Sequence, residues 1–227
     1  PAPAPTLRLT SRETDMPPRK PMPRPNSARP SAGGLDVAGM GVYMIGIGGC
    51  GMSGLARMMR TRGAVVSGTD QSPQESTRAL EAEGIEVGFD QSRAWLPERC
   101  GLVVASAAVK ADHPQVLEAR KRGVRVLSYA EALGLSMVGR IGIAVAGTHG
   151  KSSTTAMTGT ALVDAGVDPT VIVGATSRQL VKGNIGSTTA AGGVGGQSPA
   201  GFRLGGKAVG AGLWKGLPGV LVAEACE

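Results

Sequence analysis

The chain has 227 residues, enough for one large or two small domains, and 41% of them are apolar while only 3% are aromatic. This composition suits a globular α/β core built from Val, Ala, Leu and Ile. The net charge of +7 does not by itself indicate a nucleic-acid partner, because residues 1–30, with six Arg or Lys and two acidic residues, supply +4 of it. No apolar run is long enough to span a bilayer, and the N-terminus lacks the apolar core of a signal peptide, so we expect a cytoplasmic protein with no membrane contact.

Residues 1–38 read as a basic tail, and nine prolines fall within residues 1–30. Such a segment cannot bury enough apolar surface to order itself, so we expect an extended, disordered arm. No aromatic residue interleaves the basic ones, which argues for a solvated arm rather than a nucleic-acid contact.

Short apolar runs then alternate with segments of helical periodicity. This rhythm predicts a parallel sheet covered by helices, and hence a Rossmann-like α/β domain over residues 39–138. The predicted strands are 41–47, 64–68, 102–106 and 124–127, with a weaker one at 85–87. The predicted helices are 51–62, 73–83, 112–122 and 129–137.

A glycine cluster follows the first predicted strand. Gly46, Gly48 and Gly51 satisfy the spacing G-x-G-x-x-G, and Asp70 ends the second strand roughly 20 residues later, as a dinucleotide fold expects. Such a unit can hold a pyrophosphate at the helix N-terminus with the acid near a sugar hydroxyl, and the pyrophosphate need not belong to NAD. The alternative is that the glycines serve only packing and that Asp70 caps a turn.

A second phosphate-type turn opens the next domain, predicted at residues 139–227. The apolar run Ile141–Val145 leads into Gly147 and Gly150, and a helix-like stretch follows. Here backbone N–H groups can approach an anion, Lys151 can reach terminal phosphates and the Ser152 hydroxyl can reach Mg²⁺, so we predict an ATP site of the P-loop type. The full P-loop pattern has glycine where this chain has Ala146, and a glycine-rich turn with a solvated lysine is the alternative.

The end of the chain combines a glycine-rich segment with an apolar run. Residues 184–212 show no sustained periodicity and are expected to form a mobile loop. The run Gly219–Glu224 reads as a buried strand ending on a carboxylate, which could bind Mg²⁺ beside the phosphate loop or simply cap the strand. Three widely spaced cysteines, at 50, 100 and 226, are expected to be reduced thiols.

Five blocks of the sequence, taken together and in this order, resemble the Mur ligase family. The resemblance covers nearly everything from about residue 39 onward. It implies a step of peptidoglycan synthesis in which ATP and Mg²⁺ drive amide formation between UDP-N-acetylmuramate and L-alanine through an acyl phosphate. The blocks are Ile45–Gly54, Val66–Asp70, Val104–Ala108, Ala146–Thr155 and Val222–Glu227.

The resemblance also implies roles for individual residues. The sugar diphosphate would lie among Gly48, Gly49, Gly51, Met52 and Ser53, with Asp70 and Ser106 placing the nucleotide. The ATP phosphates would lie among Gly147, Thr148, His149, Gly150, Lys151, Ser152 and Ser153, and Mg²⁺ would contact Ser152 and Glu224. Lys151 would neutralise charge on the transferred phosphoryl group, and His149, inside the loop, is expected to position rather than to act as general base.

Mur ligases continue well past the Val-Ala-Glu strand, so the resemblance implies that these 227 residues are a fragment that keeps a UDP-sugar site but is inactive. Other interpretations stay open at this stage. One is a non-catalytic UDP-sugar-binding module, another is an NAD-dependent oxidoreductase, and a third is a ligase that recycles murein peptides onto the same sugar nucleotide.

Overall fold

The structure is a computed structural model that describes residues 34–175, 177, 180 and 201–225, and these belong to one compact unit, residues 32–227. Most of the predicted tail, most of the predicted loop 184–212 and Cys226 lie outside the described residues, so their predictions stay predictions. None of the helices in the described part of the chain combines the length and apolarity needed to cross a bilayer.

The first sheet has the strand order β3-β2-β1-β4-β5, and all its pairings are parallel. The predicted parallel-sheet α/β fold is therefore confirmed. The carboxyl ends of the three central strands are aligned, because Ile45 pairs with both Thr69 and Ala105. The strands are β1 (Gly41–Ile45), β2 (Val65–Thr69), β3 (Glu86–Gly88), β4 (Cys100–Ala105) and β5 (Arg125–Ser128).

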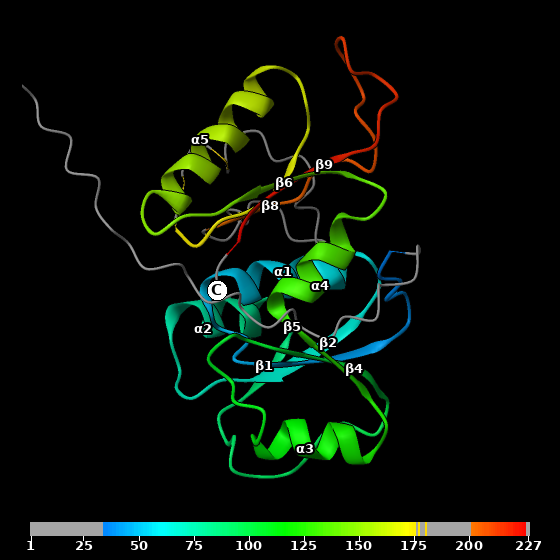
Figure 1. The fold of residues 1–227 in the computed structure, drawn as a ribbon, viewed down its shortest axis with the longest axis vertical. Helices are drawn as coiled ribbons and strands as arrows, with labels where there is room; N and C mark the ends of the chain where they lie inside the picture. Colours follow the sequence, from blue (N-terminus) through cyan, green and yellow to red (C-terminus); the bar gives the residue numbers. More distant parts are fainter. Residues whose placement is uncertain (1–33, 176, 178–179, 181–200, 226–227) are drawn as a thin grey trace, which may run out of the picture. The chain divides into compact units, whose positions relative to one another are not determined.

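Helices cover both faces of this sheet (Figure 1). One face carries α1 (Cys50–Thr61), α2 (Glu75–Ala82) and α4 (Tyr129–Met137), which contribute to the main apolar core. The other face carries α3 (Pro114–Lys121), which packs through Val116 and Ala119 on a smaller cluster. Each helix begins and ends within two residues of its predicted bounds.

The second sheet has the order β6-β9-β7-β8. Its strands are β6 (Ile141–Val145), β7 (Thr170–Ile172), β8 (Phe202–Arg203) and β9 (Val220–Glu224), and α5 (Lys151–Asp164) packs against β9 and β7. Strand β9 lies between β6 and β7 and is buried along its whole length, as its uninterrupted apolar sequence predicts.

The prediction of a mobile loop was wrong for its last part. Phe202 and Arg203 are buried and pair antiparallel with β7, and the Arg203 guanidinium lies 2.6 Å from the Asp168 carboxylate. A two-residue strand carries no readable periodicity, and its ion-pair partner is 35 residues away, so the sequence pattern gave no sign of it. Strand β7, only three residues long, was also missed.

The main apolar cluster contains residues from elements of both sheets. The main cluster includes Leu55 and Leu133 from α1 and α4, together with Ile172 and Leu221 from β7 and β9. At Gly54 of α1 a Cβ would lie 2.8 Å from Ile172 Cγ2, so only a glycine allows the helix to approach this closely. The predicted domain boundary near residue 139 stays a prediction.

Candidate functional site

The first glycine turn is built where β1 ends. Gly46 has φ +78°, and a Cβ on it would lie 2.8 Å from Ser106 Oγ, so the turn requires glycine here. The N–H groups of Gly46 and Ile47 both donate to the Thr69 carbonyl, at 2.7 and 3.0 Å. The ends of β1, β2 and β4 are thus tied together at this turn.

The Asp70 carboxylate holds this turn through hydrogen bonds to the backbone. Its Oδ2 accepts a hydrogen bond from Gly48 N at 2.8 Å, its Oδ1 accepts one from Gln71 N at 2.8 Å, and the residue is 9% exposed. The structure therefore brings together Gly48 and Asp70, two residues of the predicted sugar-nucleotide set, and the backbone N–H of the first donates to the carboxylate of the second. Asp70 shapes the loop, and its predicted contact with a nucleotide stays a prediction.

Helix α1 opens directly on the glycine turn. Its N-cap, Gly49, offers no side chain to the first-turn N–H groups, which have no acceptor within the helix. Met52 and Ser53 are buried, so any contact of theirs with a ligand would be made by the main chain. A helix N-terminus without a capping side chain is a suitable place for a diphosphate.

The second glycine turn links β6 to α5. Gly147 and Gly150 both have positive φ, +148° and +76°, and Gly150 is the N-cap of α5. Lys151 Nζ donates to Gly147 O at 2.6 Å and to Thr148 O at 3.5 Å, so the ammonium lies over the carbonyls of its own loop. These bonds are exposed, and exposed pairings of this kind contribute little, so a phosphate can compete for the lysine. His149 is exposed and bonds to no other described side chain or backbone group.

Glu224 ends β9 directly beside this turn. It pairs with Val145, the last residue of β6, and Ala225 N donates to Val145 O at 2.9 Å. The Glu224 carboxylate accepts a hydrogen bond from Gly174 N at 2.8 Å, and the residue is 4% exposed.

The donor set fits Mg²⁺. Mg²⁺ prefers oxygen ligands, and two are available here: the carboxylate at the end of β9 and the Ser152 hydroxyl in the first turn of α5. Both residues lie at or just after the edge of the sheet where β6 and β9 end. In residues 34–175 and 201–225, no three His, Cys, Asp or Glu side chains gather into a cluster that could hold a metal by themselves. This agrees with a cation held by one or two protein groups together with phosphates.

The start of α1 and the Glu224 side chain approach each other at Gly174, just after β7. A Cβ on Gly174 would lie 3.0 Å from Cys50 Cβ, at the start of α1, and 3.2 Å from Glu224 Oε2. Cys50 is an exposed free thiol. The N-terminus of the first glycine helix and the Glu224 carboxylate of the second site are therefore close neighbours.

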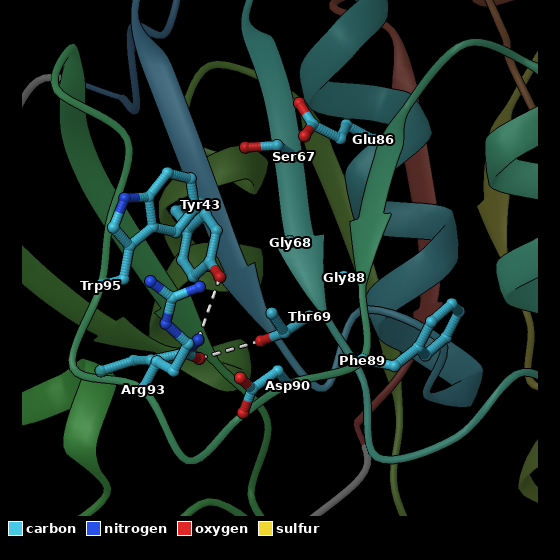
Figure 2. A pocket seen from close by; sticks show the side chains of 11 residues that line it. Tyr43, Ser67, Gly68, Thr69, Glu86, Gly88, Phe89, Asp90, Arg93 and Trp95 are labelled. Carbon is cyan, nitrogen blue, oxygen red and sulfur yellow. Dashed lines mark hydrogen bonds between the residues drawn. The ribbon is translucent and has the colours of Figure 1, made fainter.

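A separate cavity of about 190 Å³ lies on the α3 face of the first sheet (Figure 2). Tyr43 and Trp95 meet edge to face there, with ring centroids 6.2 Å apart, and Gln115 links the hydroxyls of Tyr43 and Thr69. Burial raises the pKa of the Tyr43 hydroxyl. The cavity was not predicted, because its lining comes from β1, β2, β3, the loop after β3 and α3, and no predicted site residue lines it.

Comparison with family models and curated proteins gives one consistent result. Residues 41–140 match the model described as the Mur ligase family, catalytic domain. The UDP-N-acetylmuramate--L-alanine ligase of Kineococcus radiotolerans is 47% identical over 149 residues, which is 64% of this chain and 32% of that protein. The enzyme of the same name from Salinispora arenicola is 45% identical over 63% of this chain and 28% of its own length. The chain thus spans about a third of the curated relatives that it matches.

Solved structures agree. A UDP-N-acetylmuramate-alanine ligase from Thermotoga maritima aligns with a TM-score of 0.63 and 26% identity, over 82% of this chain and 36% of that one. A murein peptide ligase from Psychrobacter arcticus aligns with a TM-score of 0.64 and 30% identity, over 83% of this chain and 38% of that one. An alignment over 82 or 83% of the chain is longer than residues 1–140, so it extends into the second sheet, which begins at residue 141.

Proposed function

We propose, because this chain is related to the Mur ligase family, that it provides the sugar-nucleotide and ATP-phosphate sites for the ATP-dependent joining of UDP-N-acetylmuramate to L-alanine. The observation that carries the proposal is the meeting at Gly174 of the α1 N-terminus with the Glu224 carboxylate. Ligation requires the acceptor sugar nucleotide and the phosphate donor to lie close together, and this contact supports that arrangement.

The first site would bind the diphosphate. The first-turn N–H groups of α1 would receive its oxygens, helped by the partial positive charge of the helix N-terminus. Asp70 would keep the turn in shape by holding the Gly48 N–H, and Ser106 would lie beside the nucleotide at the end of β4.

The second site would bind the triphosphate. Lys151 would leave the Gly147 carbonyl and contact the phosphates, and the first-turn N–H groups of α5 would surround them. Ser152 and Glu224 would hold Mg²⁺, which offsets negative charge on the phosphates when bound. Transfer of the terminal phosphoryl group to the substrate carboxylate gives an acyl phosphate, and attack by the amine then expels phosphate and forms the amide.

The choice of amine is the finer part of the proposal. The curated relatives at 45 to 47% identity are named for L-alanine, whereas the solved structures include both an L-alanine ligase and murein peptide ligases at nearly equal TM-scores. We favour L-alanine because the curated relatives at 45 to 47% identity carry that name. A cytoplasmic location belongs to the same proposal.

Calorimetry with the purified chain tests the two binding steps. We expect UDP-N-acetylmuramate to bind, and ATP to bind in the presence of Mg²⁺. Binding of NADH instead, detected by its fluorescence, would favour the oxidoreductase, and binding of the sugar nucleotide without ATP would favour a non-catalytic module. An ADP-release assay with UDP-N-acetylmuramate and L-alanine then tests the expectation that these 227 residues are inactive, which turnover would contradict.

A further inference from the structure

Tyr129 links the two glycine sites through a contact that no motif contains. It is the first residue of α4, is 5% exposed, and belongs to the main apolar core. Its hydroxyl donates to the main-chain carbonyl of Glu224 at 3.4 Å, across 95 residues of sequence. The hydrogen bond therefore reaches the residue proposed to hold Mg²⁺.

The same phenol packs on the first glycine cluster. A Cβ on Gly51, the second residue of α1, would overlap the Tyr129 hydroxyl and would lie 2.9 Å from its Cε2. Any residue other than glycine at position 51 would push the ring away. Gly51 is thus needed for Tyr129 as well as for the approach of a diphosphate.

The backbone that carries Tyr129 is itself held in place. Ser128 caps α4 by accepting a hydrogen bond from Glu131 N at 3.2 Å, and the Glu131 carboxylate accepts one from Ser128 N at 2.8 Å. This capping box fixes the start of the helix, so the phenol has a rigid base.

We propose that Tyr129 is a positioning residue, which holds the Glu224 main chain at a fixed place against the Gly51 end of α1. The Glu224 carboxylate is held from the other side by Gly174 N, so the hydroxyl and the amide together restrain both the main chain and the carboxylate of this residue. The consequence for metal and nucleotide binding rests on the proposed function, whereas the hold on Glu224 does not.

The chain offers a matched control, because it contains exactly one other tyrosine. Tyr43 is also buried, and its hydroxyl also takes part in a hydrogen bond, here as acceptor from Gln115 Nε2 at 3.1 Å. It lines the cavity on the α3 face, where its hydroxyl is linked through Gln115 to Thr69 (Figure 2). Tyr129→Phe and Tyr43→Phe each remove one buried hydroxyl and keep the ring, so they separate a positioning role from a general loss of stability.

The first measurement is amide exchange at Gly174, followed by NMR in the full chain. Loss of a neutral hydrogen bond from the Tyr129 hydroxyl should loosen Glu224 and speed exchange of the Gly174 N–H roughly fivefold, relative to amides at the centre of β1. Tyr43→Phe should leave that ratio unchanged. Equal ratios in the two variants would overturn the proposal.

The second measurement uses Mn²⁺ as a paramagnetic probe, bound with ATP and followed by electron paramagnetic resonance. Tyr129→Phe should weaken Mn²⁺ several-fold and leave the affinity for UDP-N-acetylmuramate unchanged, with urea midpoints of both variants as a check on folding. Unchanged Mn²⁺ affinity in a variant with altered Gly174 exchange would overturn the positioning role. If the unmodified chain binds no Mn²⁺ with ATP, the proposed function fails, and the exchange ratio still decides whether Tyr129 holds Glu224.

Discussion

Replacement of Asp70 by asparagine tests whether one buried carboxylate holds the first glycine turn. Each of its oxygens accepts a backbone hydrogen bond at 2.8 Å, one from Gly48 and one from Gln71. The asparagine amide keeps one acceptor oxygen but presents an NH₂ group where the second N–H needs an acceptor. Asp70→Asn therefore removes a charge-assisted bond and leaves a buried donor without a partner.

The magnitude follows from those two losses. A hydrogen bond to a charged group contributes about 1.5–3 kcal/mol, and an unsatisfied buried donor costs about 1–3 kcal/mol, so the two overlapping effects should lower the free energy of unfolding by about 2–4 kcal/mol. For a protein of this size the melting temperature would fall by roughly 4–16 °C. Because the Gly48 N–H would lose its fixed direction, affinity for the sugar nucleotide should fall as well.

Urea unfolding followed by tryptophan fluorescence measures the effect. Asp90→Asn is the control, because the Asp90 carboxylate also accepts two hydrogen bonds, from Ser92 N and Oγ, but on the exposed surface. We expect the control to unfold like the unmodified chain. If the urea midpoint of Asp70→Asn equals that of Asp90→Asn, the carboxylate does not hold the turn and the reasoning is refuted.

Three further predictions concern other parts of the molecule. Lys151→Met should reduce ATP affinity at least tenfold in calorimetry, and unchanged affinity would rule out its phosphate contact. The urea midpoint should stay the same, because the hydrogen bonds from the lysine to the carbonyls of its own loop are exposed. Burial lowers the pKa of His113 from its usual 6.5, so as pH falls below that value the unfolded chain takes up the proton first and stability declines through the folded-state pKa. His113→Asn should flatten the decline as pH falls below 6.5, and an unaltered slope would contradict the assignment. Gly134→Ala should raise the free energy of unfolding by about 1 kcal/mol through helix propensity, because a Cβ at position 134 meets no atom within 4 Å. Gly54→Ala should stabilise the protein less, because its Cβ would crowd Ile172. Equal unfolding free energies of the two variants would show that the helix can shift.

The sequence was most informative where a pattern is local. The alternation of apolar runs and helical periodicity gave the order of elements up to residue 145, and helix α4 has the predicted bounds. The glycine positions followed from backbone geometry, since Gly46 and Gly150 adopt the positive φ that a strand-to-helix turn of this kind needs. Asp70 was found from its place after the second strand, at the spacing from the glycines that a dinucleotide fold expects, and Glu224 because it ends an apolar strand.

The sequence was least informative where an element is short or a group has a distant partner. Strand β8 escaped prediction because two residues show no period, and it is held by the ion pair of Arg203 with Asp168. The sequence left open whether Asp70 caps the turn or contacts a nucleotide; the folded chain shows its carboxylate accepting from the Gly48 N–H, and the nucleotide contact stays a prediction. A motif names the groups that are available and does not determine which of them bond to each other.

The sequence by itself therefore determined the α/β class, the two glycine turns and the acids that end their neighbouring strands, because these depend on backbone preferences and on apolar periodicity along a few residues. Only the tertiary structure decided that the start of α1 and the Glu224 carboxylate both lie against Gly174 and that Tyr129 reaches Glu224. Such contacts join segments far apart in the sequence, 95 residues in the case of Tyr129 and Glu224, and they arise from packing of helices and strands that no local pattern encodes.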